Sequence, residues 1–189
     1  MSVKTINELA DYMDKIVNVR SYEDTQIEEG IKELFLTAFL LGPSLANLQP
    51  WEMLVMETEA EREQVIQATL DPFLTEGSYG AQKWLEKAPF LAVVCLEKRR
   101  ALARLGEKGV LFAIEDTFMA IQNFRLSASF NGLATSVVRE FDKQKMQQNL
   151  RLPWYLEPLA IITAGYSNAV LEIPPRFRAE DIVHRGRWE

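Results

Sequence analysis

Residues 110–130 constrain the fold more than any other segment of this chain. They have the length of a long helix, and apolar side chains occur on nearly every side of it. A helix that is apolar all round has to be buried all round, which in a chain of 189 residues predicts a central position and contact with a second subunit. Asn131-Gly132 is a typical left-handed stop for this helix. The apolar positions are Val110, Leu111, Phe112, Ile114, Phe118, Met119, Ile121, Phe124, Leu126 and Phe130.

Composition and charge narrow the class of protein. Hydrophobic residues make up 48% of the chain and charged residues 25%, which is ordinary for a globular domain. We expect a single domain with an arm at this length of 189 residues. The net charge of −6 argues against nucleic acid or an anionic membrane as a partner. Because no apolar run reaches the length of a membrane span and the N-terminus has no apolar leader core, a cytoplasmic protein is expected.

Few side chains in this chain can carry out catalysis by themselves. It has one cysteine and one histidine. Cys95 lies in an apolar, strand-like run, where a thiol is usually a small buried side chain. His184 has no second histidine with which to build a zinc site, and no Gly-x-Ser-x-Gly elbow accompanies it. An enzyme this poor in reactive groups is most simply explained by a bound cofactor.

The apolar patterns predict helices alternating with buried strands, so we expect a central sheet of four or five strands surrounded by helices. Thr25 with Glu28 three residues later has the pattern of a capping box. The basic segment 98–109 is interpreted as a solvated loop or lid. The expected helices are 4–17, 25–41, 59–69, 82–85, 110–130 and 142–150; the expected strands are 52–57, 90–96, 134–138 and 158–164, followed by an extended tail from residue 167.

A polar loop joins the second expected helix to the first expected strand. Pro43 stops the helix, and Pro50 favours an extended conformation for the residue before it. Ser44, Asn47 and Gln49 lie between the two prolines and are neutral donors and acceptors. A buried planar heterocycle with ring nitrogens and carbonyls needs such groups, although the same side chains are also typical of a loop that caps a helix.

This loop, Pro43-Ser44-x-x-Asn47-x-Gln49-Pro50-Trp51, resembles the flavin-contacting loop of the nitroreductase family. Other family-like features follow in the same order, so the resemblance extends from about residue 14 to the end of the chain. These features are Ala88-Pro89, Asp116, Ala120-x-Gln122-Asn123, Ala128, Gly132-Leu133-Ala134-Thr135, Leu152-Pro153, Gly165-Tyr166, Pro175-Arg176 and Asp181-Ile182-Val183-His184.

The resemblance implies an α+β nitroreductase-like fold, with a mainly antiparallel sheet of four to five strands flanked by helices. It implies that residues 1–189 form one such domain and that an arm from about 167 to 189 wraps the partner subunit of a homodimer. It also implies FMN, with residues drawn from both chains, and NADH or NADPH as electron donor. A small-molecule electron acceptor, such as a nitroaromatic or a quinone, would then be reduced by a ping-pong mechanism in which the flavin carries the chemistry.

The family's flavin-binding positions map unevenly onto this sequence. Pro43, Ser44, Asn47 and Gln49 match the flavin-contacting loop, and Arg176 matches a position that pairs with the FMN phosphate, with Arg178 as a second candidate. The N-terminal phosphate motif, usually Arg-x-Ser-x-Arg before an aromatic residue, is incomplete. Aligned on the aromatic Tyr22, the motif has Arg20 and Asn18 at its second arginine and its serine, but Ile16 at its first arginine.

A second departure follows the expected strand 134–138. Many family members have a Glu-Gly pair here whose backbone N–H faces flavin N5, whereas this chain has Arg139-Glu140 after Val138. A side chain in place of glycine can narrow the pocket. Together with Ile16 this leaves two alternatives to the reductase: a flavin-binding protein of the same fold with lost or altered activity, or the same fold applied to a different reaction. No Gly-x-Gly-x-x-Gly fingerprint selects between NADH and NADPH.

Overall fold

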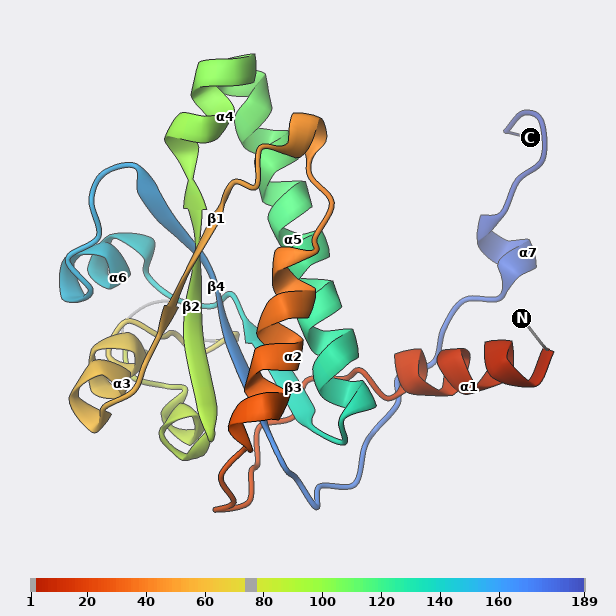
Figure 1. Cartoon of the computed structure of the whole chain (residues 1–189), viewed down its shortest axis with the longest axis horizontal. Coiled ribbons are helices and arrows are strands. Elements are labelled where there is room, and N and C mark those ends of the chain that lie inside the picture. The colour runs from red at the N-terminus through yellow and green to blue at the C-terminus, as the bar shows by residue number, and fades with distance from the viewer. Residues whose placement is uncertain (1–2, 74–77, 189) are drawn as a thin grey trace.

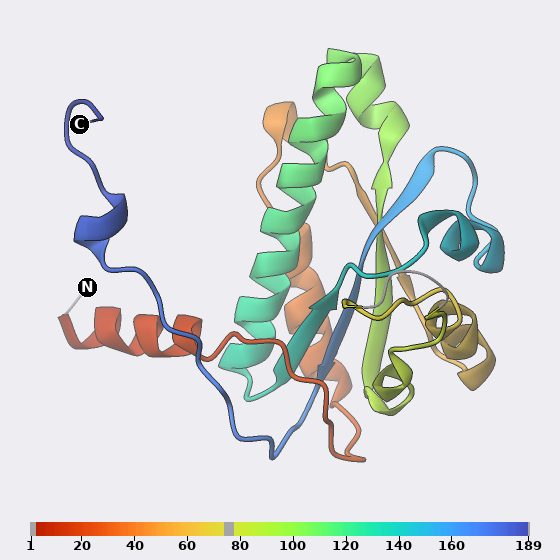
Figure 2. The same cartoon turned by 180° about the vertical axis from the view of Figure 1, so that it is seen from behind.

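The computed structural model describes residues 3–73 and 78–188. Four strands form one antiparallel sheet in the order β1-β2-β4-β3, with helices on both faces (Figures 1 and 2), which confirms the expected α+β fold. The elements are α1 (Val3–Asp14), α2 (Glu29–Leu40), η1 (Leu45–Asn47), β1 (Trp51–Val55), α3 (Glu59–Ile66), η2 (Lys83–Lys87), β2 (Phe90–Glu97), α4 (Lys98–Leu105), α5 (Glu107–Phe130), β3 (Ala134–Val138), α6 (Lys143–Asn149), β4 (Leu156–Gly165) and α7 (Ala179–Ile182).

Strand β2 separates two apolar cores. Successive side chains of a strand point to opposite faces of the sheet. The even-numbered residues from Phe90 to Val94 pack in the core formed with α2 and α5, and the odd-numbered residues from Leu91 to Cys95 pack with α3, η2 and α6. All of β2 is therefore buried, as its unbroken apolar run predicts. Burial raises the pKa of the Cys95 thiol to about 12, which fits a structural cysteine.

The predicted capping box at Thr25 is wrong. Helix α2 begins only at Glu29, and the residue before it makes no side-chain cap. Ile27 is buried in the core ahead of the helix, which keeps this segment extended. The capping box lies instead at α3, where Thr58 Oγ1 accepts from the backbone N–H of Glu61 and the Glu61 carboxylate accepts from the backbone N–H of Thr58.

The solvated loop expected over residues 98–109 is also wrong. Most of this segment forms helix α4, and α5 begins at its end. Lys, Arg, Ala and Leu are strong helix formers, and the buried Ala101 fixes the helix against its surroundings. Its basic side chains are largely neutralised, since Arg99 and Arg100 both pair with the buried carboxylate of Glu97.

Helix α5 is buried on one side only within the single chain that the structure describes, and its contact with a second subunit stays a prediction. Its small and apolar residues pack against α2 and the sheet, whereas a second apolar stripe stays open. The exposed fractions on that stripe are 59% for Leu111, 42% for Phe112, 42% for Met119 and 70% for Phe130. An apolar surface of this kind marks an interaction site.

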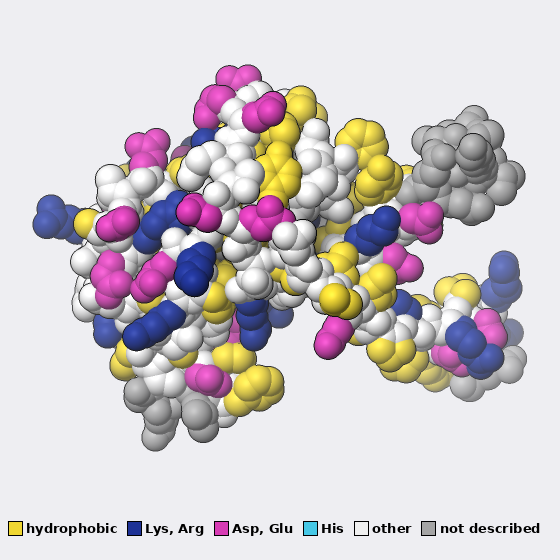
Figure 3. Space-filling model, turned by 90° about the horizontal axis from the view of Figure 1, so that it is seen from below, with side chains coloured by type: hydrophobic (Ala, Val, Ile, Leu, Met, Phe, Trp, Pro, Cys, Tyr) yellow, Lys and Arg dark blue, Asp and Glu magenta, His cyan; other side chains and the backbone are white. Residues whose placement is uncertain are grey.

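Helix α1 and residues 167–188 project away from the sheet (Figure 1). Tyr12 of α1 lies against Phe130, with the ring centres 5.3 Å apart. Both projections carry hydrophobic side chains (Figure 3). On the arm, Val170 and Phe177 are 91% and 82% exposed. Apart from the short helix α7, residues 167–188 form no helix or strand.

Gly42 lies just after α2, where the backbone packs closely against Ala120 of α5. A Cβ at Gly42 would lie 2.5 Å from Ala120 Cβ, so the backbone would have to move. We expect Gly42→Ala to destabilise the protein by about 1–3 kcal/mol. Gly30 is the matched control, because nothing lies within 4 Å of its Cβ position. Gly30→Ala should be neutral or stabilising by up to about 1 kcal/mol in urea unfolding; equal effects of both variants would contradict this packing.

Candidate functional site

A cavity of about 510 Å³ opens between the segment after α1, helix α5 and the C-terminal arm. Three guanidinium groups line it, from Arg20, Arg125 and Arg176, together with Asn18 and one carboxylate, Glu172. The other lining residues are Ile16, Val17, Val19, Ala169, Val170, Leu171 and Pro174. The cavity is therefore cationic, in a chain whose net charge is −6.

No ion pair neutralises Arg20, Arg125 or Arg176 within the described residues. Elsewhere in the same chain arginines do pair, for example Arg100 with Glu97. Guanidinium groups that converge on a cavity without carboxylate partners suit a phosphate, which accepts their N–H donors in a fork geometry. The residues present thus fit the phosphate group of a flavin nucleotide.

The segment that carries Asn18 and Arg20 is tied to the sheet edge. The backbone N–H of Val19 donates to the Thr135 carbonyl at 3.0 Å, and the Tyr22 hydroxyl lies 2.7 Å from Thr163 Oγ1. Burial raises the pKa of Tyr22 to about 12, so this anchor stays protonated. These contacts hold Arg20 at the mouth of the cavity, beside strand β3.

The Asn18 side chain forms hydrogen bonds within the protein itself. Its Oδ1 accepts from Arg125 Nη2 at 3.1 Å and from the backbone N–H of Val137 at 3.2 Å. Its Nδ2 donates to the Val137 carbonyl at 3.4 Å. Asn18 therefore shapes the cavity wall and orients Arg125, a residue that the sequence analysis did not select.

The polar loop after α2 adopts a strained backbone. Ala46, Asn47 and Gln49 all have positive φ, at 52°, 55° and 45°. Such conformations are unfavourable for residues other than glycine, and they gather at functional sites where the surroundings enforce them. The Asn47 and Gln49 side chains are exposed on this loop, available to a ligand, and Pro43 is exposed beside them.

Three contacts enforce that backbone. Ser44 Oγ accepts from the N–H of Gln49 at 2.9 Å, so the Ser44 hydroxyl stabilises the turn. Asp116 of α5 accepts from the N–H of Leu45 at 2.8 Å. Arg100 Nη1, from α4, donates to the Gln49 carbonyl at 2.6 Å. In the sequence, Asp116 stands out only as a family-like position, and Arg100 lies in the segment predicted to be a solvated loop. No local pattern indicates that Arg100 contacts the polar loop.

The residues after β3 lie at the surface of the protein. Val138 is buried, whereas Arg139 and Glu140 are exposed. The Arg139 guanidinium lies over the Phe118 ring of α5, 5.8 Å from its centre. The Arg139 N–H donates to the Glu140 carboxylate at 3.1 Å, so one of the two backbone donors of this pair is occupied in this chain.

Arg178 does not line the cavity. It caps the short helix α7 through Asp181, with Nη2 and Oδ1 3.1 Å apart, and it also pairs with Glu180. The positive charge of Arg178 is therefore paired with carboxylates of the arm itself. Of the two arginines expected from the tail, only Arg176 reaches the cavity.

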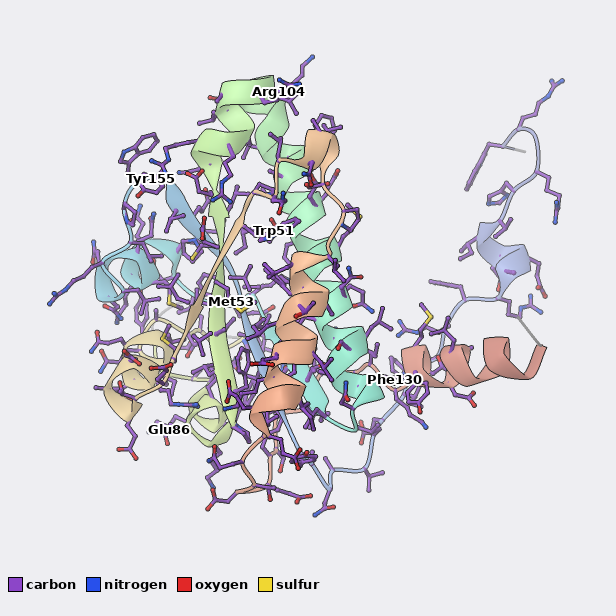
Figure 4. All side chains as sticks on the ribbon, viewed as in Figure 1. Trp51, Met53, Glu86, Arg104, Phe130 and Tyr155 are labelled. Carbon is purple, nitrogen blue, oxygen red and sulfur yellow. The ribbon has the colours of Figure 1, made fainter. Side chains whose placement is uncertain are left out.

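A single chain does not bring all of these residues together. The polar loop contacts α5 at Asp116, and the cationic cavity contacts it at Arg125. Nine residues of helix correspond to about 14 Å along the axis. In Figure 4 the two ends of α5 can be followed from the labelled residues, with Arg104 of α4 near the polar loop and Phe130 at the opposite end of α5. The polar loop and the cationic cavity are therefore separate places on the surface of one chain.

Two other kinds of site find no support in the part of the chain that the structure describes. No group of three or more His, Cys, Asp or Glu side chains there could hold a metal ion. No described helix combines the length and the apolar character that crossing a membrane requires.

The structure defines an α+β protein with a cationic cavity, and sequence comparison gives its family. Residues 18–166 match the family model described as nitroreductase family, so the chain belongs to the nitroreductase family.

Individual relatives are distant in sequence. The FMN reductase [NAD(P)H] of Bacillus subtilis is 21% identical over 197 residues, covering 97% of this chain and 75% of that protein. The oxygen-insensitive NADPH nitroreductase of Salmonella typhimurium is 24% identical over 180 residues, covering 91% and 71%. The solved NADPH:FMN oxidoreductase of Vibrio harveyi, complexed with NAD+, superimposes with a TM-score of 0.81 at 19% identity, covering 97% of this chain and 79% of that one. This last likeness shows the fold.

Proposed function

We propose that this protein is an FMN-dependent oxidoreductase that takes electrons from NADH or NADPH and passes them to nitroaromatic, quinone or similar acceptors. Membership of the nitroreductase family supports an oxidoreductase. The observation that carries the flavin assignment is the cavity with three arginines that form no ion pair within the described residues, because it suits the phosphate of FMN. Two relatives are named for FMN, one as an FMN reductase and one as an NADPH:FMN oxidoreductase.

We propose further that the working form is a homodimer. The open apolar stripe of α5 and the apolar arm would both be covered by a second copy. The polar loop of one chain could then meet the cationic cavity of the other, and the arm could wrap its partner. Each flavin site would draw on both chains.

In this arrangement the protein binds and orients its cofactor. Arg20 and Arg176 hold the phosphate, and the exposed amides of Asn47 and Gln49 contact the edge of the ring. Bound FMN would supply two-electron redox chemistry between the nicotinamide donor and the acceptor, in two separate half-reactions. Arg139 follows β3 and lies over the Phe118 ring of α5, and this pair would limit access to the flavin ring.

The test is the visible absorption spectrum of protein purified without added flavin, followed by heat release of the chromophore. We expect oxidised-flavin bands and about one FMN per chain. Anaerobic addition of NADH or NADPH should then bleach the bands. A colourless protein that also fails to take up added FMN would contradict the proposal. Bound FMN that neither donor bleaches would favour the second candidate, a flavin-binding protein with lost or altered activity, for which the occupied N–H of Arg139 is the supporting observation.

A further inference from the structure

Arg125 is an unusual residue for its position. It lies in the second half of α5, a helix otherwise rich in apolar side chains, and it is half-buried. Its side chain reaches the cationic cavity, where Nη2 donates to Asn18 and Nε donates to Thr135 Oγ1, each at 3.1 Å. No carboxylate pairs with it in the described chain. A half-buried cation without a counter-charge is costly unless an anion binds there.

The hydrogen-bond donors of Arg125 also point to an anion as its ligand. A guanidinium has five N–H donors. The two hydrogen bonds to Asn18 and Thr135 fix the plane of the group and leave its remaining donors toward the cavity. Burial lowers the pKa of Arg125, which is the effect of desolvation without a compensating carboxylate. Such an arrangement is preorganised for an oxyanion.

Arg125 could take the place of the arginine that is missing from the N-terminal phosphate motif. Ile16 stands where the incomplete N-terminal motif would have its first arginine, and Ile16 lines the same cavity as Arg125. We propose that Arg125 supplies the phosphate-binding cation that Ile16 cannot, so that the FMN phosphate is held by Arg20, Arg125 and Arg176. In this arrangement Asn18 is a positioning residue, which acts through Arg125. The inference rests on the proposed function.

The test compares FMN with riboflavin, which lacks only the phosphate. Apoprotein carrying Arg125→Gln is titrated with each flavin, and binding is followed by quenching of flavin fluorescence. Glutamine keeps a donor for Asn18 but removes the charge. We expect FMN to bind about 10- to 100-fold more weakly, the range for one charge-assisted hydrogen bond, with riboflavin affinity changed by less than about twofold.

A purely structural Arg125 gives a different result. The affinities for FMN and riboflavin would then change by the same factor, or not at all, and either outcome overturns the proposal. If Arg125→Gln does not fold, as judged by circular dichroism, Arg125→Met is scored by the same ratio. Wild-type protein that binds neither flavin would instead contradict the proposed function, so the two failures are distinguishable.

Two further variants sharpen the result. Adding Ile16→Arg to Arg125→Gln returns a cation to the same cavity, and it should restore most of the preference for FMN over riboflavin. Arg104→Gln is the matched control, because it removes one exposed arginine at the far end of α5 (Figure 4). It should leave the affinities for both flavins unchanged. Loss of the FMN preference in Arg104→Gln would show a general charge effect and overturn the assignment to Arg125.

Discussion

Replacing Arg20 and Arg176 together by leucine is expected to lower the affinity for FMN by about 10²- to 10⁴-fold. Both side chains line the cationic cavity, and within the described residues neither has a carboxylate partner. Each contact to a phosphate is typically worth about 1.5–3 kcal/mol, and each 1.4 kcal/mol is a tenfold change in Kd. The measurement is the Kd of FMN for apoprotein, alongside that of riboflavin, which should change little.

Arg178 provides the control for this double variant. It lies on the same arm but pairs with Asp181 and Glu180 and does not line the cavity. Arg178→Leu should therefore leave the FMN affinity within about twofold of wild type, as surface pairs contribute little. An Arg178→Leu variant that loses FMN as strongly as the Arg20/Arg176 double variant would place the phosphate elsewhere on the arm.

The fold could be predicted from the sequence to the extent that local patterns decide it. Unbroken apolar runs predicted the buried strands, and β2 and β4 occupy nearly the expected residues. Charge misled the prediction for α4, because the basic run was interpreted as solvated. The neutralising carboxylate of Glu97 ends the preceding strand, only two and three residues before Arg99 and Arg100, but its burial there is visible only in three dimensions.

The candidate site was predictable where its residues follow one another in the chain. The polar loop is an example, since Ser44, Asn47 and Gln49 share one turn. Arg125 was not predictable in this way. A single arginine in an apolar helix has the pattern of a surface position, and its role emerges only when β3 and the segment after α1 bring Thr135 and Asn18 to it. Residues that act through tertiary contacts leave no local signal.

The separation of the polar loop from the cationic cavity leads to a sharp prediction about subunits. Suppose that each FMN lies between the loop of one chain and the cavity of the other. A dimer with a substituted loop in one chain and a substituted cavity in the other should then keep one intact site. We expect heterodimers of Asn47→Gly with Arg176→Leu, selected through two affinity tags, to retain about one FMN per dimer. One of their two sites combines an undamaged loop with an undamaged cavity. Each variant homodimer should lose most of its FMN. Glycine is chosen because it keeps the positive φ of 55° at Asn47 without strain.

The reciprocal heterodimer separates this arrangement from a site within one chain. A chain carrying both substitutions, paired with a wild-type chain, has one damaged half in each shared site, so it should retain almost no FMN. Sites confined to single chains would give the opposite pattern, with about one FMN in the wild-type/double-variant dimer and almost none in the dimer of single variants. Shared sites and single-chain sites thus predict opposite FMN contents for the two heterodimers. Measuring both contents decides whether the polar loop and the cationic cavity, which contact α5 at different points, bind one cofactor together.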